Sequence, residues 1–211
     1  MLNPFAQAGF LISCAQLTQL PEDAQPEIAF AGRSNAGKSS AMNLLCAQKQ
    51  LARVSKTPGR TQLLNLFGVP GGRFVDLPGY GYAAVPKGVR LDWGKLVGSY
   101  LEGRQNLVGI VLIMDIRHPL TDYDRQMLGW AAHRGMPCHC LLTKADKLGF
   151  GASKTQLLQV RRELATIAEG ASVQLFSSET RQGLEEAQTV LMGWLGITAE
   201  TTFANWTPPA A

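Results

Sequence analysis

Residues 32–39, which read GRSNAGKS, have the types and the spacing of a phosphate-binding loop. They match the pattern G-x-x-x-x-G-K-[ST] between an apolar run and a helical pattern, which is the context that this chemistry requires. Gly32 and Gly37 let backbone N–H groups wrap phosphates, and the start of the following helix favours negative charge. We expect Lys38 to reach the outer phosphates and the Ser39 hydroxyl to bind Mg²⁺. The loop alone does not distinguish ATP from GTP.

Residues 143–146, TKAD, indicate that the base is guanine. The Asp146 carboxylate can accept hydrogen bonds from guanine N1–H and the 2-amino group, whereas adenine would leave this carboxylate without donors. The Lys144 side chain can lie along the base. Residues 176–178, FSS, follow the next apolar run, where backbone N–H groups can reach the guanine O6. A P-loop ATPase is the weaker alternative, because Asp146 opposes it.

Residues 76–79, DLPG, and residues 56–62, KTPGRTQ, are the expected sensors of the terminal phosphate. Asp76 can hold Mg²⁺ through water, and the Gly79 N–H can bond the γ-phosphate. Thr61 is the candidate for a second hydroxyl ligand of Mg²⁺, with an ordinary turn threonine as the alternative. Both loops would be ordered by the γ-phosphate and released after hydrolysis.

These motifs together predict one set of site residues. Lys38, Asn35 and Gly79 are the candidates for catalysis, and Ser39, Thr61 and Asp76 are the candidate metal ligands. The predicted nucleotide contacts are Gly32, Arg33, Ser34, Asn35, Ala36, Gly37, Lys38, Ser39, Gly59, Arg60, Thr61, Gln62, Leu63, Asp76, Leu77, Pro78, Gly79, Thr143, Lys144, Ala145, Asp146, Phe176, Ser177 and Ser178.

Tyr80 raises the question of whether the chain is an enzyme. Many nucleotide switches have Gln immediately after the glycine of the DLPG-type loop, and this Gln orients the attacking water. A phenol cannot do what a Gln amide does, so the isolated protein should hydrolyse GTP slowly. Slow hydrolysis is still hydrolysis, because positioning and charge stabilisation supply most of the catalysis of phosphoryl transfer.

The elements that must position these motifs are short apolar runs alternating with helical patterns. This alternation predicts βα units around a mostly parallel sheet. The expected strands are residues 27–33, 62–69, 73–77, 107–116, 138–146 and 173–178. The expected helices are residues 39–48, 91–104, a segment capped by Thr121 and Asp124, 154–168 and 183–196.

Two further features refine this α/β prediction. Pro70, Gly71 and Gly72 predict a hairpin, so that one of six strands is antiparallel. The predicted domains are an N-terminal extension (1–25), a GTP-binding domain (26–198) and a flexible C-terminal tail (199–211). Both end segments are expected to be poorly structured.

The composition of the 211 residues, 45% of them hydrophobic, suffices for one core. We find no apolar run of bilayer-spanning length and no basic stretch typical of a secretion signal. Of the four cysteines only Cys138 and Cys140 are close in sequence, and these two are expected to be buried thiols rather than a disulfide or a metal site. These features favour a cytoplasmic protein without a membrane partner.

The positive charge is concentrated in one segment. The net charge is +4, and residues 28–75 contain seven Lys or Arg and no acid, while the residues after them balance. Bound phosphate accounts for part of this excess, but Lys49, Arg53, Lys56 and Arg60 extend beyond the phosphate loop. They predict a polyanionic partner, with a solvated basic loop as the alternative.

The order and wording of these motifs resemble a known family. GRSNAGKSS, KTPGRTQ, DLPGYGYA, TKAD and FSS resemble small Ras-like GTPases of the translation-factor class, and KTPGRTQ with DLPGYGYA is similar to the bacterial EngB (YihA/YsxC) family. The resemblance covers roughly residues 25–196. It implies a three-layer P-loop GTPase fold with helices on both faces of the sheet. It also implies a monomer that binds the large ribosomal subunit or its precursor, assists its assembly, and is needed for cell division and septation.

The resemblance also bears on Asn35. Some relatives with Asn at this place resemble K⁺-activated GTPases, in which the Asn oxygen helps to seat a K⁺ against the phosphates. A turn-favouring Asn without an ion is the alternative. For the whole protein, the alternative to a slow GTPase switch is a non-catalytic module that senses GTP and GDP, with Tyr80 marking lost chemistry.

Overall fold

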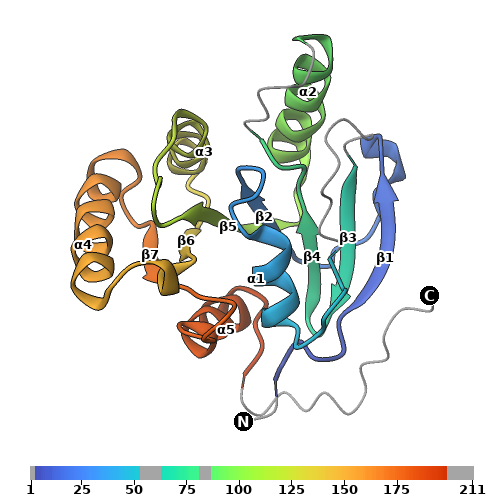
Figure 1. Ribbon diagram of the computed structural model, residues 1–211. Helices are drawn as coiled ribbons and strands as arrows, with labels where there is room; N and C mark the ends of the chain where they lie inside the picture. Colours follow the sequence, from blue (N-terminus) through green and yellow to red (C-terminus); the bar gives the residue numbers. More distant parts are fainter. Residues whose placement is uncertain (1–2, 53–62, 81–86, 199–211) are drawn as a thin grey trace.

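A computed structural model describes residues 3–52, 63–80 and 87–198 of the chain. Within these residues seven strands form one sheet in the order β1-β3-β4-β2-β5-β6-β7 (Figure 1). The strands are Gly9–Cys14 (β1), Glu27–Gly32 (β2), Leu64–Val69 (β3), Gly72–Asp76 (β4), Leu107–Asp115 (β5), Cys138–Thr143 (β6) and Ser172–Leu175 (β7). The α-helices are Lys38–Leu45 (α1), Lys87–Gly103 (α2), Asp122–His133 (α3), Phe150–Ile167 (α4) and Leu184–Trp194 (α5). Short 3-10 helices lie at Leu17–Gln19 (η1) and Ala145–Lys147 (η2).

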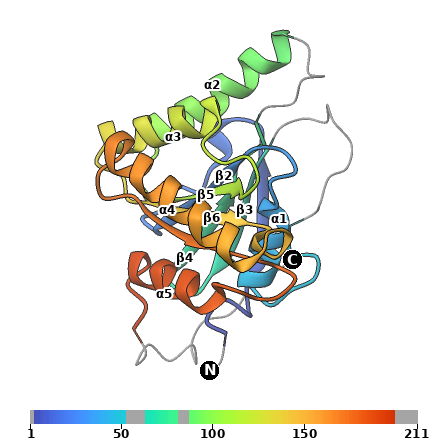
Figure 2. The same cartoon turned by 60° about the vertical axis from the view of Figure 1, so that its left-hand side comes forward.

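The helices form a layer on each face of the sheet (Figures 1 and 2). Because successive residues of a strand point to opposite faces, Leu112 and Ile113 of β5 belong to two different clusters. The cluster around Leu112 includes side chains of α2, α3 and α4, and the cluster around Ile113 includes side chains of α1 and α5. The three-layer α/β fold expected from the sequence is confirmed.

The direction of β3 also agrees with the sequence. β3 pairs antiparallel with both of its neighbours, β1 and β4, while the other neighbouring pairs are parallel. Val69 pairs with Gly72, so Pro70 and Gly71 form the turn of the predicted hairpin. Glycine is required at Gly72, because a Cβ there would lie 2.3 Å from the Pro26 carbonyl oxygen.

The N-terminal segment differs from the expectation. Instead of a poorly structured end, residues 9–14 form β1, which adds a seventh strand beside β3. The preceding Phe5 is fully buried, and its ring centroid lies 4.9 Å from that of Phe74. The physical reason is that β3 would otherwise present its free edge and the apolar side chains near Phe67 to water. The predicted tail, residues 199–211, lies outside the described residues.

Two local predictions are confirmed. The Asp124 carboxylate accepts hydrogen bonds from the Thr121 backbone N–H and hydroxyl, each at 2.8 Å, which satisfies donors at the start of α3. Cys138 and Cys140 are free and buried, as predicted, and Cys14 and Cys46 are free and buried as well. The described structure of α2 begins at Lys87, four residues before the predicted start.

Candidate functional site

The motif residues gather at one edge of the sheet. Strands β2, β4, β5 and β6 are parallel, so their carboxyl ends lie together. The phosphate loop follows β2, DLPG begins at the last residue of β4, and TKAD begins at the last residue of β6. Residues far apart in the sequence thus meet where open α/β sheets bind ligands.

The phosphate loop has backbone conformations that its residue types permit. Gly37 has φ +99° and directly precedes α1, so the N–H groups that open the helix are directed toward the loop. Asn35 has φ +63°, a left-handed conformation that asparagine tolerates better than most residues. At Gly32 a Cβ would lie 2.6 Å from the Ile113 carbonyl oxygen, so the loop starts in close contact with β5. This geometry fits a bound polyphosphate.

Lys38 and Asp76 form an ion pair across the loop. Their side chains are 11% and 12% exposed, and the ammonium contacts the Asp76 carboxylate. Lys38 is the first residue of α1, and Asp76 is the last residue of β4. Ser39, the second residue of α1, is half-buried. A carboxylate and a hydroxyl beside a phosphate loop are the hard oxygen donors that Mg²⁺ prefers, so the donor set fits this ion.

The TKAD residues are fixed by bonds to the phosphate loop. The Thr143 hydroxyl contacts the Ala36 carbonyl oxygen at 2.5 Å, and Lys144 Nζ donates to the Asn35 carbonyl oxygen at 2.7 Å. Lys144 itself has φ +59°. These contacts join the base side of the site to its phosphate side, and they hold the Lys144 stem where a base can lie along it.

The Asp146 carboxylate is oriented by two neighbours. The buried Ser177 hydroxyl donates to Oδ1 at 2.6 Å, and Lys147 Nζ lies 3.0 Å from Oδ2. The bond from Ser177, followed by that from Lys147, lowers the pKa of Asp146. The carboxylate therefore stays ionised, and its two oxygens have lone pairs left for further donors. The TKAD and FSS segments are also joined by a bond of 3.1 Å from the Ala145 N–H to the Phe176 carbonyl oxygen.

Asp115 is a site residue that the motif search missed. It ends β5, and its carboxylate lies 2.9 Å from Lys144 Nζ and accepts two bonds from the Arg117 guanidinium. Burial alone would raise the pKa of Asp115, but the bonds from Arg117 and Lys144 hold this pKa well below its ordinary value. The signal was present in the sequence, because an acid at the carboxyl end of a buried strand lies at the ligand edge of the sheet.

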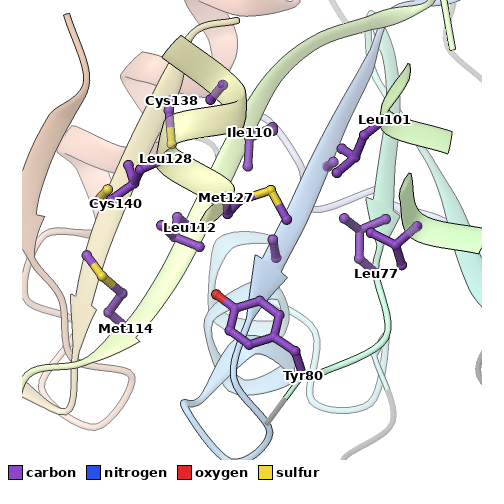
Figure 3. Close-up of a cluster of buried hydrophobic side chains, with 14 of the residues drawn as sticks. Leu77, Tyr80, Leu101, Ile110, Leu112, Met114, Met127, Leu128, Cys138 and Cys140 are labelled. Carbon is purple, nitrogen blue, oxygen red and sulfur yellow. The ribbon is translucent and has the colours of Figure 1, made fainter. Parts of the chain in front are cut away.

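The DLPG loop packs directly on the phosphate loop. A Cβ at Gly79 would lie 2.8 Å from the Ser34 hydroxyl oxygen and 3.2 Å from the Ser34 Cα, so any other residue there would require Ser34 to shift. Tyr80, which follows, is 4% exposed and turns into the core cluster instead of toward the loop (Figure 3). Its side chain therefore does not occupy the place of a water-orienting Gln in this structure.

The remaining predicted residues divide into two groups. Arg33 and Asn35 are exposed, and together with Ser34 and Lys144 they line a cleft of about 240 Å³. The half-buried Leu63 precedes β3. Gly59, Arg60, Thr61 and Gln62 lie outside the described residues, as do Arg53 and Lys56 of the basic segment. The assignment of Thr61 to Mg²⁺ stays a prediction.

Comparison with known proteins decides the family. Residues 27–144 match the family described as 50S ribosome-binding GTPase. The probable GTP-binding protein EngB of Xanthomonas euvesicatoria pv. vesicatoria (strain 85-10) is 52% identical over 201 residues, which cover 94% of this chain and 97% of that protein. The chain belongs to the EngB family of GTP-binding proteins. Since this is a GTPase family, the chain binds guanine nucleotides and hydrolyses GTP.

Solved structures agree on the fold of this EngB protein. A crystal structure of a probable GTP-binding protein engB has a TM-score of 0.64 at 19% identity, covering 81% of this chain and 98% of its own. Translation elongation factor SelB from Methanococcus maripaludis, in complex with the GTP analogue GppNHp, has a TM-score of 0.58 at 17% identity. That match covers 84% of this chain and 35% of SelB. None of the helices in the described part of the chain has the length and hydrophobicity needed to cross a membrane.

Proposed function

We propose that this EngB-family GTPase is a slow switch that acts in the cytoplasm, as a monomer, in assembly of the large ribosomal subunit. The observation that supports this most directly is the match of residues 27–144 to a family described as 50S ribosome-binding GTPase. A requirement for normal cell division and septation is part of the same proposal. GTP would favour binding to the subunit or its precursor, and hydrolysis would favour release.

The geometry supports a division of labour for GTP hydrolysis. Lys38 would neutralise charge on the outer phosphates, and the Gly79 N–H would bond the γ-phosphate. Ser39, Asp76 and Thr61 would hold Mg²⁺, which when bound neutralises charge that develops on the phosphate oxygens. These groups position the phosphates and stabilise charge, while Tyr80, the residue after Gly79, is turned into the core and does not replace a water-orienting Gln. We expect a slow intrinsic rate for this reason.

Potassium is part of the same proposal. The exposed side chain of Asn35 lies in the phosphate loop at a left-handed backbone position and lines the cleft. Its oxygen could help to seat K⁺ beside the phosphates, where the cation would supply charge stabilisation. Turnover should then be faster in K⁺ than in Na⁺, and Asn35→Ala should remove this difference. Equal turnover in the two salts would assign Asn35 to the turn alone.

The basic segment is the proposed contact with ribosomal RNA. Lys49 is exposed shortly after α1, and Arg53, Lys56 and Arg60 follow it in the sequence. Phosphate contacts made by these side chains would make binding salt-sensitive. Replacing all four by Ala should weaken binding to the large subunit and flatten its salt dependence. Unchanged binding and an unchanged salt dependence would leave the segment as a solvated loop.

Sedimentation of the full chain with purified large subunits tests the central proposal. We expect cosedimentation with a non-hydrolysable GTP analogue and markedly less with GDP. The matched control is Asp146→Asn, which should cosediment with a non-hydrolysable xanthosine analogue. Absence of the protein from the subunit fraction in both nucleotide states would contradict the ribosomal role.

The second candidate is a non-catalytic module that senses GTP and GDP. Its support is the inward position of Tyr80, whose side chain lies in the core rather than where a water-orienting Gln would lie. Membership in a GTPase family argues against it. Absence of GTP turnover in K⁺, in Na⁺ and with large subunits would favour it.

A further inference from the structure

The Tyr80 side chain makes a buried bond that the function described above does not use. Its hydroxyl donates to Asp124 Oδ1 at 2.5 Å, and the two residues are 4% and 2% exposed. Burial, and then the nearby Asp124 carboxylate, raise the pKa of Tyr80 well above its ordinary value, so the phenol stays protonated. Figure 3 shows the ring on the side of Leu112 and Met127, within the core.

The Asp124 carboxylate serves two elements at once. Oδ2 accepts the bonds from Thr121 that begin α3, while Oδ1 accepts the bond from Tyr80. Thr121 and Asp124 also line the cleft of about 240 Å³, together with Ser34 and Asn35 of the phosphate loop. The bond therefore links the DLPG loop to the start of α3, beside this cleft.

The Tyr80 backbone links the same point to the phosphate loop. The Ser34 N–H donates to the Tyr80 carbonyl oxygen at 2.9 Å, and the Tyr80 N–H donates to the Gly32 carbonyl oxygen at 3.3 Å. Gly79 lies beside these bonds, in contact with Ser34. Gly79 is therefore followed by a residue whose side chain is anchored in the core and whose backbone is bonded to the phosphate loop.

We propose that Tyr80 is a positioning residue: its bond to Asp124 holds the Gly79 backbone against the phosphate loop, in the place that favours bound GTP over GDP. The inference rests on the proposed role of the Gly79 N–H as the γ-phosphate contact. It explains why a tyrosine stands after DLPG in a working GTPase. The side chain does not orient water; it fixes the loop from the side of the core and joins γ-phosphate sensing to α3.

The test is a double-mutant cycle with Tyr80→Phe, Asp124→Asn and both changes together. Phe keeps the ring in the core and removes the hydroxyl. We expect Tyr80→Phe to lower the affinity for a non-hydrolysable GTP analogue about five- to tenfold and to leave the affinity for GDP unchanged within about twofold. Asp124→Asn should act in the same direction, and the double variant should lose little beyond either single change.

Tyr100→Phe is the matched control. The Tyr100 hydroxyl donates to the fully buried Glu27 carboxylate at 3.0 Å, so the same kind of bond is removed near the start of β2, at the opposite end of that strand from the phosphate loop. Both Phe variants should lower the melting temperature, and only Tyr80→Phe should change the ratio of the two nucleotide affinities. An unchanged ratio, or equal losses for GTP analogue and GDP, would assign the bond to core stability alone.

The two levels of the proposal fail separately. The affinity ratio is measured on the isolated protein, without ribosomes. If Tyr80→Phe leaves the ratio unchanged while the wild-type protein still sediments with large subunits in the GTP state only, the role of Tyr80 is overturned and the proposed function stands. If the ratio changes but the wild-type protein does not associate with large subunits, the role of Tyr80 stands and the proposed function is overturned. If Tyr80→Phe unfolds at assay temperature, Asp124→Asn measured against Tyr100→Phe decides the same question.

Discussion

The base side and the phosphate side of the site differ in how far they are assembled. On the base side, Asp146, Lys144 and Asp115 each have bonds to neighbouring protein groups that hold them in place. On the phosphate side, Lys38 and Asp76 bond to each other, although the proposed roles direct one to phosphate and the other to Mg²⁺. The base-side groups are therefore already held in place for a nucleotide. On the phosphate side, the bond between Lys38 and Asp76 would have to break before the two side chains could take their proposed roles.

This difference separates affinity from discrimination. GTP and GDP share the guanine, so contacts on the base side contribute equally to both affinities. The γ-phosphate is present in GTP alone, so any preference for one state must arise on the phosphate side. Variants of the two sides should therefore have different signatures when GTP and GDP are compared.

The largest effect is expected for Asp146→Asn, on the base side. The amide replaces one acceptor by a donor, which opposes a donor of guanine. The affinities for GTP and for GDP should therefore both fall about 1000-fold. Xanthine nucleotides should gain affinity, since xanthine has a carbonyl where guanine has its 2-amino group. Titration with fluorescent nucleotides measures both changes. The control is Asp122→Asn, at an exposed acid of α3, and unchanged guanine affinity in Asp146→Asn would refute the assignment.

The next effect is expected for Lys38→Ala, on the phosphate side. Removing one partner of a partly buried charge pair should lower the affinity for a GTP analogue about 100-fold. The loss for GDP should be smaller, because GDP lacks the γ-phosphate that Lys38 is proposed to contact. Lys154→Ala is the control, because Lys154 lies on α4 over the Phe150 ring. Equal losses for the two nucleotides would remove the proposed difference between the sides.

The sequence predicts the contiguous motifs on both sides of the site, but it does not predict the contacts that join them. TKAD and FSS are each contiguous residues at strand ends, yet the Lys144–Asn35 and Asp146–Ser177 bonds on the base side join residues 109 and 31 positions apart. The Lys38–Asp76 pair and the Tyr80–Asp124 bond join residues 38 and 44 positions apart, and no local pattern specifies such contacts.

The N-terminal strand is not predicted by the sequence for a related reason. Strand β1 has no turn signal or charge pattern of its own, and it is stabilised by pairing with β3, which is more than 40 residues later in the chain. Its residues GFLISC alternate between exposed and half-buried. This pattern indicates a strand only when the free edge of β3 is taken into account.

A smaller effect on the base side is expected for Asp115→Asn. The amide keeps the shape of the side chain but removes the charge that holds Lys144, so the Lys144 stem is less well fixed along the base. The affinities for GTP and for GDP should both fall about tenfold, by the same factor. Arg117→Ala is the control: it removes the more exposed partner of Asp115 and should change affinity less. A loss confined to GTP would place Asp115 on the phosphate side instead.

The smallest effect is the pH dependence of stability that Asp146 contributes in the absence of nucleotide. The bond from Ser177, and then that from Lys147, lower its pKa from the ordinary 3.8, so folding favours the ionised form. The stabilisation is therefore fully present above pH 3.8 and is lost as the pH falls through the lower pKa of the folded state.

The test compares the wild type with Asp146→Asn, whose amide cannot titrate. The difference in melting temperature between wild type and this variant should be constant between about pH 7 and 5 and should shrink at lower pH. Because the Lys147 side chain that pairs with Asp146 is 56% exposed, the difference should be small and reduced by salt. A difference that grows as the pH falls would contradict the proposed preorganisation of the base side, because it would show that folding favours the protonated carboxyl.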